Sequence, residues 1–189
     1  MKADWPCRVG LAAMLAATAT PALTQEHDAP AALQAVLAAT PNARQCFARI
    51  YDRAHLAAHP GQKVAELGFR MIWRKLDGEC GGGDCLQGYG FQLKVRRRND
   101  KRPFAASGPC LERDGKAFCG VECDGGGLYV TKNADGSLLL SFGDSWGIRL
   151  GEECGEDSGE ATELLPGKDD RVFRLDPLPA GQCPAYEKW

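Results

Sequence analysis

The stretch that decides the fold runs from Cys80 to Cys123 and reads CGGGDCLQGYGFQLKVRRRNDKRPFAASGPCLERDGKAFCGVEC. It holds five cysteines, a glycine-rich entry, two segments in which apolar and polar residues alternate, and an Asp-Gly turn. Alternation with a period of two is typical of a strand with one buried face, and Asp-Gly between such segments is typical of a tight hairpin. Repeated cysteines in this setting indicate disulfide bonds. The stretch therefore predicts a disulfide-stapled antiparallel β-sheet.

The Asp114-Gly115 turn sets the register of one hairpin. Centring the turn there pairs Arg113 with Lys116, Glu112 with Ala117, Leu111 with Phe118 and Cys110 with Cys119. The cysteine pair then falls at a non-hydrogen-bonded position, where Cα atoms approach to about 4.5 Å. That separation is within the range of disulfide geometry. The sequence therefore predicts a Cys110–Cys119 disulfide.

Strand patterns continue on both sides of this stretch. Apolar side chains recur at every second residue from Ala65 to Trp73 and again from Tyr89 to Val95. A hairpin around Asn133–Gly136, with strands at 128–131 and 137–142, and further strands at 148–150 and 172–175 are also expected. We therefore expect a mainly β fold, an antiparallel barrel or sandwich of about six to eight strands, with one or two N-terminal helices packed on it.

The region before the first long strand carries helical signals. Pro30 near a first turn and Pro41 at an end predict a short helix over 29–39. A second helix is predicted from Asn42, because Phe47, Ile50, Tyr51 and Ala54 follow helical spacing. The predicted organisation is therefore a signal peptide at 1–24, a helical N-terminal segment at 25–62 and a β domain at 63–189.

The N-terminus has the layout of a secretory signal peptide. Lys2 and Arg8 flank a basic stretch, an apolar run covers Leu11 to Ala19, and small residues follow. Cleavage is expected between about residues 19 and 25. The apolar run is shorter than the roughly 20 residues of a membrane span. A protein exported to the periplasm or secreted is therefore expected, with no membrane span.

The cysteines agree with export. Cys7 leaves with the signal peptide, and an even set of eight cysteines remains, which is typical of a disulfide framework outside the cytoplasm. A Cys46–Cys183 disulfide would join the N-terminal segment to the C-terminal tail. Spacing alone leaves open how Cys80, Cys85, Cys123 and Cys154 pair. A zinc site is the weaker interpretation, because the close spacings are C-x4-C and C-x3-C with no nearby histidine.

Patterns for catalysis are present only in part. Gly143-Asp144-Ser145-Trp146-Gly147 matches G-x-S-x-G, but a strand pattern follows it and no histidine occurs after His59. A nucleophile elbow needs a following helix and a later histidine, so a bend within a β-hairpin is expected instead. His55 and His59 lack the glutamate of a metalloprotease motif, and neither Asp124 nor Asn133–Gly136 begins a complete calcium loop. We expect no catalytic residue, metal or cofactor.

The most specific functional signal is a basic cluster. Residues 60–116 hold twelve Lys or Arg against seven Asp or Glu, whereas residues 117–189 hold six against fourteen. Clustered arginines bind phosphate and carboxylate groups bidentately. An exported protein meets anionic envelope components and acidic proteins rather than nucleic acid. The candidate binding residues are Lys94, Arg96, Arg97, Arg98, Lys101 and Arg102; a solubilising loop is the alternative.

Three further segments bear a resemblance to known proteins. They read CFARIYDRAHLAAHP at 46–60, VECDGGG at 121–127 and DDRVFRLD at 169–176. Together they resemble a group of small exported bacterial proteins that carry no assigned function. The resemblance covers most of the mature chain and implies no catalytic residue.

These observations favour a non-catalytic exported module that binds an anionic ligand or partner through Arg96–Arg102. A carboxylate-based hydrolase of envelope polysaccharide is the first alternative, with pairs such as Glu122 and Asp124 or Asp169 and Asp170 as candidate groups. An inhibitor of an envelope-directed enzyme is the second alternative, because a small stapled scaffold suits that role as well.

Overall fold

The computed structural model of the chain describes residues 29–75, 87–122, 124–151 and 162–183. The predicted signal peptide at 1–24 lies outside these residues. So do four of the cysteines, Cys80, Cys85, Cys123 and Cys154.

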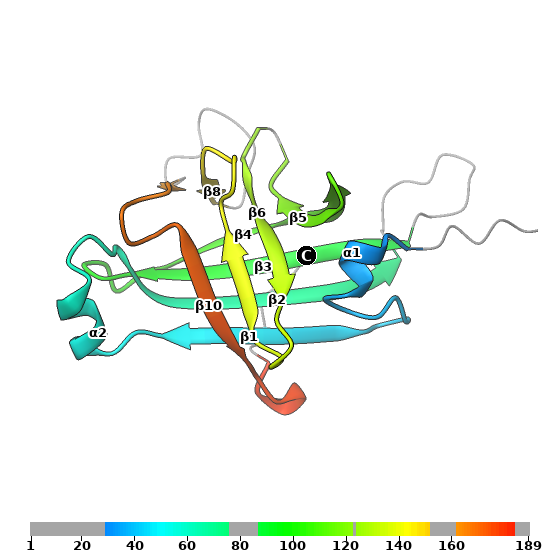
Figure 1. The fold of residues 1–189 in the computed structure, drawn as a ribbon, viewed down its shortest axis with the longest axis horizontal. Helices are drawn as coiled ribbons and strands as arrows, with labels where there is room; N and C mark the ends of the chain where they lie inside the picture. Colours follow the sequence, from blue (N-terminus) through cyan, green and yellow to red (C-terminus); the bar gives the residue numbers. More distant parts are fainter. Residues whose placement is uncertain (1–28, 76–86, 123, 152–161, 184–189) are drawn as a thin grey trace, which may run out of the picture.

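Eight antiparallel strands close into a barrel in the order β1-β10-β7-β6-β5-β4-β3-β2 (Figure 1). They are β1 (Arg44–Ile50), β2 (Val64–Lys75), β3 (Gln87–Arg97), β4 (Pro103–Arg113), β5 (Lys116–Gly120), β6 (Gly127–Lys132), β7 (Leu138–Ser141) and β10 (Val172–Pro177). Strands β8 (Ile148–Leu150) and β9 (Thr162–Leu164) form a separate two-stranded sheet. The predicted mainly β class is therefore confirmed, as a barrel rather than a sandwich.

The barrel interior is filled by the alternating apolar residues. In β2, Leu67, Phe69 and Met71 are at most 1% exposed, and Trp73 is 8% exposed. The bulge at Ala65 shifts the register where β2 begins, and the alternation is regular from Glu66 onward. Burial of this kind contributes about 25 cal/mol per Å² of apolar surface. Other interior residues from the remaining walls are Phe47, Phe91, Leu93, Leu128, Leu138, Leu140, Phe173 and Leu175.

The β4–β5 hairpin has the predicted register. Its four residue pairs run from Cys110 opposite Cys119 to Arg113 opposite Lys116. Asp114 and Gly115 both have positive φ, 50° and 70°, as a type I′ turn requires. The Cys110–Cys119 disulfide is present, with a Cα–Cα distance of 4.0 Å. The predicted Cys46–Cys183 disulfide is present as well, with a Cα–Cα distance of 5.4 Å.

The helix predicted from Asn42 is wrong, because residues 44–50 form strand β1. β1 makes seven residue pairs with β2, and this long-range pairing overrides the helical spacing of Phe47 and Ile50. Phe47 is fully buried in the barrel, whereas Ile50 is 68% exposed. The β domain therefore begins at Arg44 and not at residue 63, so the described part of the predicted helical segment, residues 29–62, is not a separate helical unit.

Two short helices do lie in this region. Helix α1 (Ala31–Gln34) is shorter than the predicted span of 29–39, because the chain turns after it to bring Leu33, Val36 and Leu37 into the core at one barrel end. The Tyr89 hydroxyl donates to the Leu37 carbonyl there, at 2.8 Å. Helix α2 (Arg53–Ala58) is capped at its N-terminus by Asp52, whose carboxylate accepts from the His55 N–H at 2.7 Å.

The seam between β1 and β10 closes the barrel with few backbone contacts. Only two residue pairs join these strands, Phe47 with Pro177 and Ala48 with Asp176. The Cys46–Cys183 disulfide and the Leu178 N–H to Cys46 carbonyl bond, at 2.8 Å, extend the seam past the end of β10. At its other end, Asp170 accepts from the backbone N–H groups of Lys63 and Val64. Side chains and a disulfide therefore replace a long ladder at this seam.

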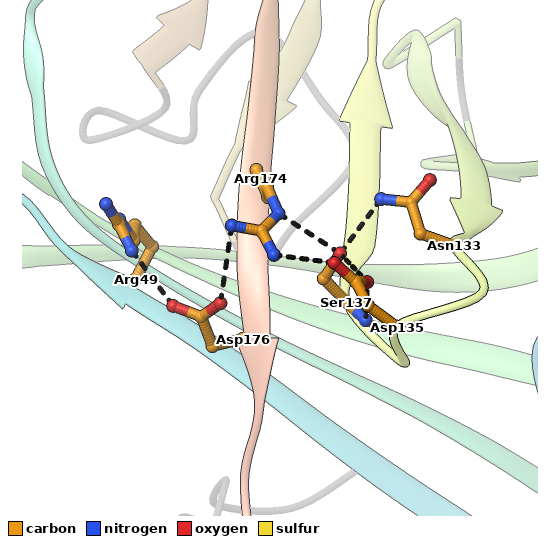
Figure 2. A network of polar contacts seen from close by, with 6 residues as sticks. All are labelled: Arg49, Asn133, Asp135, Ser137, Arg174 and Asp176. Carbon is orange, nitrogen blue, oxygen red and sulfur yellow. Dashed lines mark hydrogen bonds and ion pairs between the residues drawn. The ribbon is translucent and has the colours of Figure 1, made fainter.

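A polar network on the outer side of β10 links the seam to the β6–β7 turn (Figure 2). Asp176 accepts from Arg49 of β1 at 2.9 Å, and Arg174 lies between Asp176 and Asp135. The Ser137 hydroxyl donates to Asp135 at 2.6 Å, and this bond is the main reason that the pKa of Asp135 falls to about 2. The network therefore connects β1, β10 and the β6–β7 turn on the outer side of the barrel.

Candidate functional site

An open hollow lies where β2 begins and β3 ends. Its volume is about 650 Å³, and its lining, which we call the basic hollow, is Pro60, Gln62, Lys63, Arg97, Arg98 and Asn99. The antiparallel pairing explains how three cations meet there. Val64 pairs with Arg97, and the Arg98 N–H donates to the Lys63 carbonyl at 2.7 Å.

Arg97 is held in place by its surroundings. By the alternation along β3, it lies on the strand face that points into the barrel. Its guanidinium is 5.2 Å from the centroid of the Phe104 ring. One terminal nitrogen of Arg97 donates to the Glu163 carbonyl of β9. The Arg97 Nε is buried and has no hydrogen-bond partner in the described part of the chain. The ring contact and the hydrogen bond to Glu163 therefore fix the orientation of the Arg97 guanidinium.

The carboxylates beside the hollow are occupied by backbone groups. Asp170 is fully buried and accepts from Lys63 N–H at 2.6 Å. Burial raises the pKa of Asp170, although both backbone bonds act to lower it. Asp169 accepts from Gly61 N–H at 2.9 Å, and Asp100 accepts from Arg102 N–H at 2.9 Å, which lowers the pKa of Asp100. These bonds fix the loop positions that place Lys63 and Arg98 around the hollow.

The structure brings only part of the predicted basic cluster into this hollow. Arg97 and Arg98 line it, but Arg96 faces the outer side of the barrel and pairs with Glu66 at 2.9 Å. Lys94 is exposed on the same outer side, and Lys101 is exposed in the loop before β4. Arg102 is 3.5 Å from the Asp100 carboxylate and 5.9 Å from the Phe104 ring centroid.

Lys63 was not among the predicted binding residues. The signal that identifies it is the pairing of the strand beginning after Lys63 with the strand ending at Arg97. Pairing these two predicted strands as neighbours places residue 63 beside residue 98.

A second concave region lies over the outer face of β4, β5 and the loops after β5 and β7. Its volume is about 520 Å³. We call it the aromatic groove, and its lining combines apolar residues (Pro109, Leu111, Phe118, Val121, Trp146), charged residues (Arg113, Glu122, Asp124, Asp144) and Gly120, Gly126 and Ser145.

The G-x-S-x-G segment at 143–147 forms part of the lining of this groove. Gly143 and Gly147 have positive φ, 57° and 156°, and the segment turns the chain from β7 into β8. The Ser145 hydroxyl donates to the Gly147 carbonyl at 2.9 Å and accepts from Gly127 N–H at 3.3 Å. The predicted bend is confirmed, but the hairpin around it is wrong, because β8 pairs with β9 and not with β7. Ser145 therefore has a structural role.

His55 of α2 and His59, the residue that follows this helix, form a small stack with Tyr51. The His55 ring lies 4.7 Å from the Tyr51 ring and 4.4 Å from the His59 ring, centroid to centroid. A His55 ring nitrogen is 3.0 Å from the Gln62 side-chain oxygen. Within the described residues, no three His, Cys, Asp or Glu side chains are grouped as a metal site requires.

Comparison with known proteins adds no family to this geometry: no family model, curated protein or solved structure matches the chain. The resemblance to small exported bacterial proteins therefore stays a prediction. Over the described ranges, no helix has both the length and the apolar character needed to cross a bilayer. The two disulfides are typical of a protein that folds in an oxidising compartment.

Proposed function

We propose that this protein is a non-catalytic module, exported to the periplasm or secreted, that binds an anionic ligand or acidic partner at the basic hollow. The observation that supports this most directly is the convergence of Lys63, Arg97 and Arg98 on one open hollow. Arginine and lysine at such a site bind phosphate or carboxylate groups by charge-assisted hydrogen bonds. Because the nearby carboxylates bond backbone N–H groups, their charge is partly offset within the fold.

The geometry also separates binding roles within the predicted cluster. Arg97 is oriented by Phe104 and Glu163, so it would present its guanidinium in a fixed direction. Lys63 and Arg98 flank it from the two paired chain segments. Arg96, which pairs with Glu66, would contribute mainly to the long-range field.

The test is salt-dependent binding of fluorescein-labelled dextran sulfate, measured by fluorescence anisotropy between 25 and 300 mM NaCl. The Lys63→Ala/Arg98→Ala variant should bind at least about tenfold more weakly at the lowest salt, with a shallower salt dependence. The matched control is Arg44→Ala/Lys116→Ala, which removes two positive charges from the opposite end of the barrel.

Equal weakening by both double variants would contradict a localised site, since only net charge would then matter. Binding by the wild type that does not respond to salt would contradict the proposal as a whole. Retention on envelope fractions gives a cellular version of the test. The Arg96→Ala/Arg97→Ala/Arg98→Ala variant should be retained less than the wild type.

Export has its own test. Intact-mass measurement of the protein produced in a bacterial host should show an N-terminus processed between about residues 19 and 25. A full-length, unprocessed chain in the cytoplasmic fraction would contradict export.

Hydrolysis of polysaccharide is the weaker proposal. Glu122, Asp124 and Asp144 line one groove, as a carboxylate mechanism requires. A general acid needs a raised pKa. The Tyr129 hydroxyl donates to Asp144 at 2.7 Å and lowers the pKa of that carboxyl instead. Asp144 is therefore unsuited to the general-acid role.

A further inference from the structure

We propose that the aromatic groove is a second binding site, separate from the basic hollow, and that it binds one or two rings of an uncharged saccharide. Trp146 would supply a stacking face, Asp144 and Glu122 would accept hydrogen bonds from hydroxyl groups, and Arg113 would donate to ring or hydroxyl oxygens. Four properties of the groove lead to this inference.

The first property is exposed apolar surface concentrated in a concave region. Trp146 is 48% exposed and Leu111 is 46% exposed, and both line the groove. Single exposed apolar side chains are common, but two large ones facing one hollow mark a contact surface. An indole face is a good partner for the apolar face of a ring that carries polar groups at its edge.

The second property is rigidity of the rim that carries Trp146. The Gly127 N–H donates to the Gly147 carbonyl at 2.9 Å, and the Arg149 N–H donates to the Gly125 carbonyl at 2.7 Å. A Cβ on Gly126 would lie 2.1 Å from the Gly147 oxygen and 3.2 Å from the Trp146 ring. Glycine is therefore required at 126, where φ is 69°, and the two loops are locked together. A stacking face fixed in advance loses little entropy on binding.

The third property is a near balance of charge. Asp144, Glu122 and Asp124 are opposed by Arg113 in the groove and by Lys116, whose ammonium is 5.9 Å from the Tyr129 ring centroid. The Arg113 guanidinium is 3.8 Å from the Phe118 ring centroid, and both residues line the groove. The carboxylates disfavour an anion, while the guanidinium disfavours a cation. An uncharged polar ligand suits this arrangement best.

The fourth property is the mixture of donors and acceptors. Ionised carboxylates only accept hydrogen bonds, and a guanidinium only donates them. Saccharide hydroxyls do both, so adjacent hydroxyls can bond a carboxylate and Arg113 together. The volume of about 520 Å³ is within the usual range of small-molecule sites.

The experiment is a titration of the full mature protein with three uncharged probes, cellohexaose, chitohexaose and maltohexaose, followed by tryptophan fluorescence and calorimetry. At least one probe should bind and change the fluorescence. Trp146→Ala should weaken that binding by at least about tenfold, and Trp146→Phe should retain more of it than Trp146→Ala. Ile50→Ala, which removes an exposed apolar side chain elsewhere, should leave it unchanged.

The result must also be distinct from the proposed function. Saccharide binding should persist in Lys63→Ala/Arg98→Ala and should hardly change between 25 and 300 mM NaCl. Failure of all three probes to bind at millimolar concentration would overturn the saccharide inference and leave the anion site untouched. Binding of choline in their place would also overturn it, because the groove would then select a cation through its carboxylates and indole.

Discussion

Two neighbouring regions of the barrel wall are held together by different means. β2 and β3 are joined by eleven residue pairs, whereas β1 and β10 are joined by two. The β2–β3 contact is a continuous β-ladder over a buried apolar face. The β1–β10 contact depends on the Cys46–Cys183 disulfide, the Arg49–Asp176 ion pair and the hydrogen bonds that Asp170 accepts from backbone N–H groups.

The difference shows how a small barrel can close without a complete ladder. Backbone pairing is local between β2 and β3, which are consecutive in the chain. It is distant between β1 and β10, where closing a long loop costs entropy. A disulfide lowers that cost by restricting the unfolded chain. The basic hollow lies where the two regions meet, with Arg97 at the end of the ladder and Lys63 attached to Asp170 at the seam.

The largest expected effect comes from the ladder region. Phe69 is fully buried and its ring is 5.9 Å from the Phe91 ring, centroid to centroid. Phe69→Ala should lower the free energy of unfolding by about 3–5 kcal/mol, because it leaves a cavity in the barrel. Urea unfolding followed by circular dichroism measures this change. A loss under about 1 kcal/mol would mean that the interior is not packed as described.

The second effect concerns the two disulfides. Cys46–Cys183 spans 137 residues and Cys110–Cys119 spans 9. Cys46→Ser/Cys183→Ser should cost about 2 kcal/mol more stability than Cys110→Ser/Cys119→Ser, because loop-closure entropy grows with the logarithm of loop length. The short hairpin also keeps its ladder. Urea unfolding of both variants under oxidising conditions makes the comparison, and equal losses would contradict the role assigned to the seam.

The sequence predicts these two regions unequally. The alternation of apolar and polar residues was sufficient to predict β2 and β3, and the Asp114-Gly115 turn was sufficient to predict the β4–β5 register. In these segments the local sequence pattern agrees with the burial that the tertiary structure imposes. They disagree at β1, where Phe47, Ile50 and Tyr51 have helical spacing but the segment pairs with β2. Both cysteine pairs that the structure describes were predicted.

The sites were harder to predict than the fold. The run of arginines correctly indicated Arg97 and Arg98, which line the basic hollow. Alternation along β3 places Arg96 on the outer face, so the third cation of the hollow is Lys63. The aromatic groove was not predicted, because it is formed by the outer face of β4 and β5 together with two glycine-rich loops that are distant in sequence and meet through backbone bonds around the Gly126–Ile148 bridge. Neither loop contains a binding motif when it is considered alone.

The third effect is a pH dependence at the seam. Burial raises the pKa of Asp170 above the value of about 3.9 in an unfolded chain. The folded protein therefore keeps this proton to a higher pH than the unfolded chain. The free energy of unfolding should fall as the pH rises from the unfolded pKa of Asp170 through its folded pKa. Asp170→Asn should flatten this part of the profile. Urea unfolding between pH 3.5 and 7 tests it, with Asp176→Asn as the control; an unchanged slope in Asp170→Asn would contradict the assignment.

The smallest effect is expected at the outer ion pair of the seam. The Arg49 and Asp176 side chains are 38% and 50% exposed, so solvent screens their attraction. Asp176→Ala should cost less than about 1 kcal/mol, and the cost should shrink further in high salt. Thermal unfolding at 50 and 500 mM NaCl measures both. A larger loss that salt does not change would show that Asp176 acts through packing.

Hydrogen exchange followed by mass spectrometry tests the central claim most directly, by comparing the wild type with Cys46→Ser/Cys183→Ser. The account predicts faster exchange in peptides covering β1 and β10, with little change in peptides from the β2–β3 ladder. Faster exchange across all the strands, or in β2 and β3 first, would contradict a barrel whose β1–β10 seam depends on this disulfide.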